Sequence, residues 1–294
     1  MSTTSGKNLR KAIQTESPLQ VVGVTNPYHG VMAKSAGFMA LYLSGSGVAT
    51  ASYGLPDLGM TTLDNVLEDV RRVATAVDLP LLVDIDTGWG GAFMIARAMK
   101  EMARAGAAGV HIEDQVQDKR CGHRPGKQIV ATAEMQDRLK AAADAKEYKD
   151  FVLMARTDAI ASEGIDAAVE RAVAYVESGA DMVFAEAVTE LNDYKKFREA
   201  TGVPVLANLT EFGQTPAFTL DELASVGVDI ALYPLTAFRA ANKAAENALR
   251  ILRTKGTQSE IIGELQTRDE LYDYIDYQAY ESKLDELFKS DSDL

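Results

Sequence analysis

The chain has 294 residues, of which 47% are hydrophobic, and carries a formal net charge of −13 at pH 7. This charge disfavours nucleic acid and anionic membranes as partners. A single cysteine excludes a disulfide framework and is typical of a reducing compartment, so we expect a cytoplasmic protein. The first ten residues are polar and no apolar run approaches the length of a membrane span, so we expect no secretory signal and no transmembrane helix.

Short apolar runs recur along the chain and are rich in Val, Leu, Ile and Ala without alternation, as is typical of parallel strands covered on both faces. They are Leu19–Val24, Phe38–Leu43, Leu79–Asp86, Gly109–Asp114, Phe151–Asp158, Met182–Ala187, Val203–Leu209 and Asp229–Leu235. Segments with helical spacing of apolar residues lie between most of them. The clearest are Thr62–Val77, Gly91–Ala105, Ala133–Ala145, Ile165–Glu177, Thr219–Val226 and Phe238–Arg253.

Eight strands alternating with helices predict a (β/α)8 barrel of the TIM type, with an open doubly wound sheet as the alternative. We expect one barrel domain over residues 1–294, in which residues 257–294 form a helical C-terminal extension. Helical segments such as Glu270–Phe288 carry several tyrosines, which suggests that the extension packs on its own barrel or on a partner subunit.

Carboxylates lie at the ends of several predicted strands, where the active site of such a barrel forms. Asp84 and Asp86 are two residues apart, so both side chains face the same way, and Glu113 ends the next strand. Clustered carboxylates cost energy unless a cation neutralises them, and oxygen ligands suit Mg2+ or Mn2+. The alternative is that the two aspartates cap the helix that begins near Gly91.

Other polar residues end the remaining strands. Arg156 is expected to clamp a carboxylate, unless it only forms an ion pair with Asp158. The turn Ser44-Gly45-Ser46-Gly47 can present backbone amides to an anion. His29 and His111 lack the spacing of metal ligands, so we interpret both as structural.

The only cysteine lies in Lys119-Arg120-Cys121-Gly122-His123. Neighbouring cations stabilise a thiolate, so we expect the pKa of Cys121 to fall toward neutral pH, where the thiol can transfer a proton. A small buried core residue is the alternative, but flanking charges, Gly122 and Pro125 favour a loop. We expect this segment to be a mobile lid.

Six segments together resemble the isocitrate lyase and phosphoenolpyruvate mutase superfamily, and within it the family of 2-methylisocitrate lyases. They are Leu43–Gly47, Asp84–Gly88, His111–Gln115, Lys119–His123, Met154–Asp158 and Asn208–Gly213. The likeness extends from about Leu9 to Phe288, and the Lys119–His123 segment is specific to the lyase branch.

The resemblance implies a role for each matching residue. Mg2+ would be held largely through water by Asp84, Asp86 and Glu113. Substrate would be bound by Ser44, Gly45, Ser46, Cys121, Gly122, Arg156, Glu186, Asn208, Leu209, Thr210, Arg239 and Arg268. Ser46 departs from the family pattern, which has glycine at that position. A homotetramer is also implied, in which the last barrel helix is exchanged between subunits.

The implied reaction is retro-aldol cleavage of a tricarboxylate, 2-methylisocitrate, to pyruvate and succinate in propionate catabolism. Cys121 would protonate the carbanion, with Lys119 and His123 tuning its surroundings and Arg156 stabilising the developing charge. Tyr42 is the candidate base, by analogy with the family. Isocitrate lyase or a phosphonate-forming mutase of the same superfamily, and a non-catalytic carboxylate-binding relative, are the alternatives.

Overall fold

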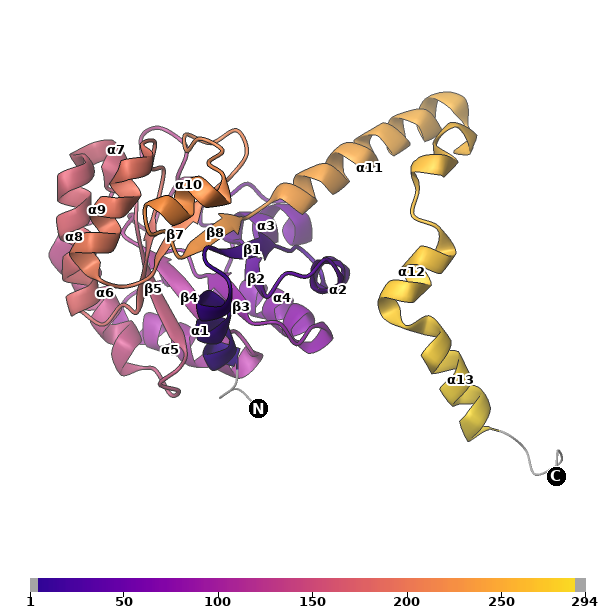
Figure 1. Cartoon of the computed structure of the whole chain (residues 1–294), viewed down its shortest axis with the longest axis horizontal. Coiled ribbons are helices and arrows are strands. Elements are labelled where there is room, and N and C mark those ends of the chain that lie inside the picture. The colour runs from indigo at the N-terminus through magenta and orange to yellow at the C-terminus, as the bar shows by residue number, and fades with distance from the viewer. Residues whose placement is uncertain (1–4, 289–294) are drawn as a thin grey trace. The chain divides into compact units, whose positions relative to one another are not determined.

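The computed structural model describes residues 5–288, and its first unit, Met1–Phe238, contains a closed barrel of eight parallel strands (Figure 1). Each strand pairs with the next in the chain, and β1 closes the barrel against β8, with Leu19 opposite Ile230. The strands are β1 (Leu19–Gly23), β2 (Ala40–Leu43), β3 (Leu81–Asp84), β4 (Gly109–Glu113), β5 (Val152–Thr157), β6 (Met182–Ala185), β7 (Val205–Asn208) and β8 (Ile230–Tyr233). The barrel prediction is therefore confirmed, and the closing pair excludes an open sheet.

Helices follow the strands, and those of the first unit cover the outside of the barrel (Figure 1). The six helices that the sequence predicts are present as α4 (Leu63–Ala76), α5 (Ala92–Ala105), α6 (Thr132–Asp144), α8 (Ile165–Glu177), α10 (Leu220–Ser225) and α11 (Thr236–Lys255). Further helical segments are α1 (Ser5–Thr15), α2 (Pro27–Ser35), α3 (Gly45–Gly47), the π-helix η1 (Val48–Ser52), α7 (Ile160–Glu163) and α9 (Leu191–Thr201). Gly106 ends α5 with φ +105°, a conformation that favours glycine.

Side chains on the strands alternate between the barrel interior and the helix layer. Leu82, Met154 and Phe184 belong to the interior cluster, together with Leu9 of α1. Val83 and Leu153 belong to a cluster shared with the surrounding helices. Because the side-chain period of a strand is two, the polar residues that follow the interior positions also face inward, at the carboxyl ends of the strands.

The second unit, Arg239–Leu294, consists of most of α11 followed by η2 (Ser259–Glu264), α12 (Arg268–Ile275) and α13 (Tyr277–Leu287). It begins within α11, ahead of residue 257, where we expected the extension to begin. The predicted helical segment Glu270–Phe288 is divided at Asp276, which has φ +53°. No helix among residues 5–288 is long and apolar enough to cross a membrane.

Candidate active site

The carboxyl ends of β3 and β4 bring three carboxylates together. Asp84 Oδ2 accepts a hydrogen bond from the Gly45 amide at 3.1 Å, and its Oδ1 accepts one from the Asp86 amide at 3.0 Å. Burial would raise the pKa of Asp84, but nearby His111, Lys119 and Arg156 lower it to about 2. The Asp86 carboxylate instead pairs with Lys119 Nζ at 2.5 Å. The N-cap of α5 is Gly91, which makes no side-chain cap, so the aspartates do not serve as helix caps.

Glu113 shows that this acidic group suits a cation. Both of its carboxylate oxygens are buried without a hydrogen-bond partner, although Arg156 Nε lies 3.4 Å from Oε2. Burial outweighs the nearby cations and raises the pKa of Glu113 well above its usual range. Among the described residues, no three His, Cys, Asp or Glu side chains surround one ion position directly. An ion here would therefore keep several waters, as Mg2+ commonly does.

Arg156, on β5, is the centre of a second group. Its Nε donates to Asp158 Oδ2 at 2.9 Å, and its Nη2 lies 3.1 Å from Glu186 Oε2. The expected pair with Asp158 is thus present, but the same guanidinium also reaches carboxylates on β4 and after β6. Burial would raise the pKa of Glu186, but Arg156 and His123 lower it far below its usual range. Asn208 Nδ2 donates to the same carboxylate at 3.3 Å.

The segment that carries Cys121 is folded down onto both groups. Lys119 Nζ lies between Asp57 Oδ1, at 2.7 Å, and Asp86. His123 Nε2 is 2.9 Å from Glu186 Oε1. Gly122 is so close to Arg156 and Glu186 that a Cβ there would lie only 2.6 Å from Glu186 Cγ. The segment therefore covers the site, and the thiol of Cys121 lies near enough to Asp57, Arg156 and Glu186 for their charges to affect it.

The structure contradicts the expectation that the pKa of Cys121 is lowered. Burial raises its pKa, and the backbone N–H of His123 offsets that effect only in part. The neighbouring cations face other groups: Lys119 pairs with two aspartates, and Arg120 donates to the Pro125 carbonyl at 3.2 Å. Sequence proximity does not show which way a side chain points, and these two cations point away from the sulfur. The thiol is consequently held in its protonated form.

Tyr42 and His111 form a buried pair inside the barrel mouth. The Tyr42 hydroxyl lies 2.8 Å from His111 Nε2, and that nitrogen is 3.6 Å from Asp84 Oδ1. Burial and the Asp84 charge raise the pKa of Tyr42 well above its usual value, which argues against a phenolate at neutral pH. Burial lowers the pKa of His111 to about 4. His111 therefore belongs to the site, although the sequence suggested only a structural role.

The remaining predicted residues lie in two places. Ser44, Gly45 and Ser46 follow β2 at the barrel mouth, and the Gly45 amide is already bonded to Asp84. Leu209 and Thr210 follow β7 directly. Arg239 and Arg268 belong to the second unit, in α11 and at the start of α12, so their part in the site stays a prediction.

Three residues at this site were missed by the sequence reasoning. Asp57 binds Lys119, Lys127 Nζ lies 2.8 Å from Asp158 Oδ1, and the Gln115 side chain holds the Arg120 backbone. Asp57 and Lys127 lie in loops, where no periodic pattern predicts the direction of a side chain. Gln115 ends the segment His111–Gln115 that resembles the superfamily, so that segment was the signal that could have indicated it.

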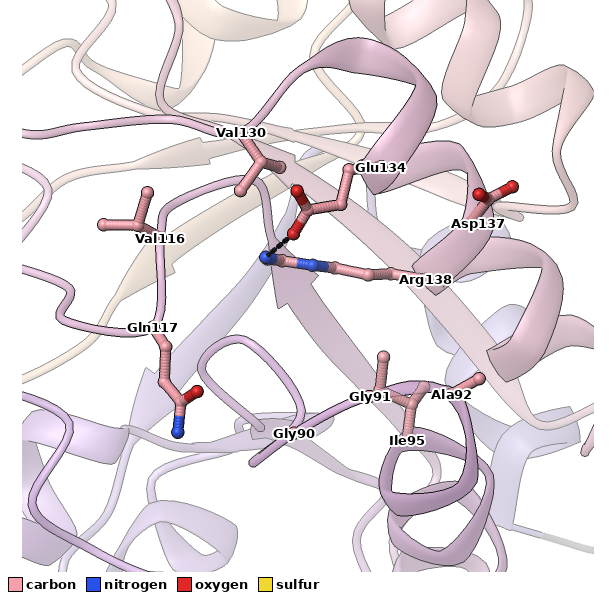
Figure 2. Close-up of a pocket in the computed structure, with 10 residues that line it drawn as sticks. All are labelled: Gly90, Gly91, Ala92, Ile95, Val116, Gln117, Val130, Glu134, Asp137 and Arg138. Carbon is pink, nitrogen blue, oxygen red and sulfur yellow. Dashed lines mark hydrogen bonds and ion pairs between the residues drawn. The ribbon is translucent and has the colours of Figure 1, made fainter.

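A separate cavity of about 460 Å³ lies at the base of the lid (Figure 2). Its lining comes from the N-terminal end of α5, from α6 and from the chain between β4 and α6, and includes Gly91, Gln117 and Arg138. None of the predicted site residues lines it. The cavity is therefore distinct from the group of charged residues at the barrel mouth.

The profile of the phosphoenolpyruvate phosphomutase family matches residues 9–253. A 2-methylisocitrate lyase from Vibrio cholerae serotype O1 is 60% identical over 298 residues, covering 99% of this chain and 97% of that protein. The chain belongs to the phosphoenolpyruvate mutase and isocitrate lyase superfamily. The resemblance inferred from six short segments is thereby confirmed.

Two solved structures of the superfamily share the fold. The crystal structure of a 2,3-dimethylmalate lyase matches with a TM-score of 0.88 and 32% identity, over 98% of this chain and 96% of that one. A phosphonopyruvate hydrolase, crystallised with oxalate and Mg2+, matches with a TM-score of 0.82 and 28% identity, over 95% and 97% of the two chains. Mg2+ is thus used within the superfamily, which agrees with the two unpartnered oxygens of Glu113 in this chain.

Proposed function

We propose that this protein is an Mg2+-dependent 2-methylisocitrate lyase that releases pyruvate and succinate. The observation that carries the proposal is the lid: Gly122 and His123 contact Arg156 and Glu186, so Cys121 is held over the cation-binding end of the barrel. The high identity to relatives with this activity supports the same reaction.

Asp84, Asp86 and Glu113 would hold the metal ion. Bound there, Mg2+ would stabilise negative charge on the oxygen atoms of the pyruvate half. Ser44, Gly45 and Ser46 lie beside these carboxylates and would bind the same half of the substrate. Glu186, Asn208, Leu209 and Thr210, at the ends of β6 and β7, would contact the succinate half.

The chemical step breaks the bond between C2 and C3 of the substrate. The C2 hydroxyl loses its proton, the C2–C3 electron pair moves to C3, and the C2 oxygen becomes the keto oxygen of pyruvate. Tyr42 is the proposed base and acts as a relay: its hydroxyl oxygen accepts that proton while its own proton passes to His111 Nε2, at 2.8 Å. The guanidinium of Arg156 would stabilise the charge that develops on oxygen.

The second proton transfer completes the reaction. Cys121 donates its thiol proton to C3, which gives succinate and leaves a thiolate. After the products leave, the thiolate takes a proton from water and His111 returns the proton of the hydroxyl to water. A thiol with a raised pKa is suited to this role because it is protonated before the reaction starts. The lid excludes water while the carbanion exists.

A direct assay tests the proposal. Purified protein is incubated with 2-methylisocitrate, and pyruvate and succinate are measured before and after treatment with EDTA and after Mg2+ is added back. We expect both products in equal amounts, loss of activity with EDTA, and recovery with Mg2+ (or Mn2+) without a change in circular dichroism. Full activity after exhaustive EDTA treatment would contradict the metal assignment.

The same assay separates the alternatives. A substrate methyl group in an apolar pocket contributes about 1–3 kcal/mol, so some cleavage of isocitrate is expected alongside the main reaction. Faster turnover of isocitrate would make the protein an isocitrate lyase. Conversion of phosphoenolpyruvate to a phosphonate would make it a mutase.

We also propose that the protein is a cytoplasmic homotetramer that works in propionate catabolism. The second unit supports an assembly, because it leaves large apolar side chains such as Leu249, Ile262 and Phe288 more than half exposed. Exchange of α11 between subunits would cover such a surface. Light scattering of the purified protein tests the tetramer, and a monomer at micromolar concentration would contradict it.

A further inference from the structure

The side chain of Gln115 is fully buried at the base of the lid, and both of its polar atoms bind one residue. Its Nε2 donates to the Arg120 carbonyl at 2.9 Å, and its Oε1 accepts from the Arg120 amide at 3.0 Å. A neighbouring strand would bind a backbone amide and carbonyl in the same way, and here the side-chain amide of Gln115 makes both hydrogen bonds. The backbone directly before Cys121 is consequently tied to the end of β4.

The backbone of Gln115 is itself firmly held. Its carbonyl accepts from Arg138 Nη1 at 2.8 Å, and the same nitrogen donates to the Glu113 carbonyl at 3.2 Å. Figure 2 shows Arg138 extending from α6, with its guanidinium bonded to Glu134. Gln115 also pairs with Ile129 in an isolated antiparallel bridge, so the loop that carries the lid begins and ends at this pair of residues. A rigid base of this kind can fix the lid in one position.

Two ion-pair contacts of the lid differ from this one in kind. Lys119 and His123 bind carboxylates that belong to the proposed metal and substrate groups, so ligands would compete for those carboxylates. Gln115 binds only backbone atoms of Arg120. Its two bonds can therefore persist whether or not the site is filled.

We propose that Gln115 is a positioning residue that sets the place of Cys121 over the site, acting through the backbone of Arg120. This inference rests on the proposed function in one respect, the role of Cys121 as the proton donor. The position of the thiol can be measured without any turnover.

Alkylation of the thiol by iodoacetamide is the test, because Cys121 is the only cysteine in the chain. Gln115→Leu removes both hydrogen bonds and keeps a side chain of similar size. Losing two buried neutral hydrogen bonds should raise the alkylation rate of the unliganded protein by about tenfold to hundredfold. Gln115→Glu keeps the acceptor for the Arg120 amide and loses the donor. Its alkylation rate should therefore lie between those of the wild-type protein and Gln115→Leu. Gln128→Leu changes an exposed glutamine of the same loop and should leave the rate unchanged.

Each outcome decides the inference. A wild-type alkylation rate in folded Gln115→Leu would overturn it, and so would an equal acceleration in Gln128→Leu. If Gln115→Leu does not fold, Gln115→Glu decides in the same way. In turnover assays Gln115→Leu should lower kcat with little change in KM, since Gln115 is bonded to the backbone of the lid. An unchanged kcat would also overturn the inference. Absence of turnover in the wild-type protein would refute the proposed function and leave the alkylation result standing.

Discussion

The lid leaves no room for a Cβ at Gly122, so this glycine offers a sharp test of the closed site. A Cβ there would lie 2.6 Å from Glu186 Cγ and closer still to Arg156 Nη2, whereas ordinary contacts begin at 3.4 Å. Neither neighbour can give way easily, because Arg156 is held by Asp158, and Glu186 by His123. In Gly122→Ala the lid must therefore stand off by about 1 Å, and a misplacement of that size costs about a hundredfold in rate.

The assay compares kcat/KM for 2-methylisocitrate in Gly122→Ala and in the wild-type protein. We expect the variant to keep the wild-type Tm, because Gly122 packs against the site and not against the apolar core. Gly263→Ala is the matched control: a Cβ at Gly263 has open space around it and the backbone is not strained. A Gly122→Ala protein with kcat/KM within about twofold of wild type would show that the lid does not close in this way during catalysis.

Three further predictions concern the lid and its thiol. Cys121→Ser should fold and bind ligand but lose most of its kcat, since a hydroxyl is a far weaker acid than a thiol. Steady-state kinetics measure this loss, and a near wild-type kcat would exclude the thiol from the mechanism. Burial raises the pKa of Cys121, so the thiolate absorbance of the wild-type protein should appear at a higher pH than that of a free cysteine, whose pKa is about 8.5. Cys121→Ser serves as the blank for this titration. A midpoint below that of free cysteine would contradict the structure. Trypsin should cut the unliganded protein first at the exposed residues Arg120 and Arg124, and Mg2+ with pyruvate and succinate should slow that cut. If cleavage there is no faster than at other sites and the ligands give no protection, the lid is not mobile.

The barrel was predictable because its signal is repeated eight times. Every predicted strand is present, and boundaries differ by a few residues at most. The helix α9 was not among the predicted ones, because its sequence is strongly polar and only Tyr194 and Phe197 are buried. The polar helix shows that two large aromatic anchors can fix a helix that has little apolar periodicity.

Strand alternation explains why so many of the charged residues could be placed in advance. Asp84, Glu113, Arg156 and Glu186 follow interior-facing positions by two residues, so the pattern of one strand fixes where each side chain points. Asp114 has the opposite parity and faces outward, where it accepts from Thr157 Oγ1 at 2.7 Å and Tyr175 OH at 3.0 Å.

Loop residues could not be placed in the same way. The sequence brings Lys119 and Arg120 next to Cys121, and this proximity predicted a lowered pKa for the thiol. In the fold, Lys119 is held by two aspartates from other parts of the chain, one of them Asp57. The direction of a loop side chain depends on which distant charge it meets, and such pairs are invisible to spacing and periodicity.

The charges at the barrel mouth favour binding of the proposed cation before the substrate. The ion pairs there join five carboxylates to Lys119, Lys127, Arg156 and His123, and a sixth carboxylate, Asp84, lies beside His111. Burial raises the pKa of Glu113, and this shift favours its neutral form and lessens the imbalance. A divalent cation beside Glu113 would favour its ionised form and supply the missing positive charge. A tricarboxylate would otherwise add its own negative charge to a site that already has a surplus, in a protein whose net charge is −13.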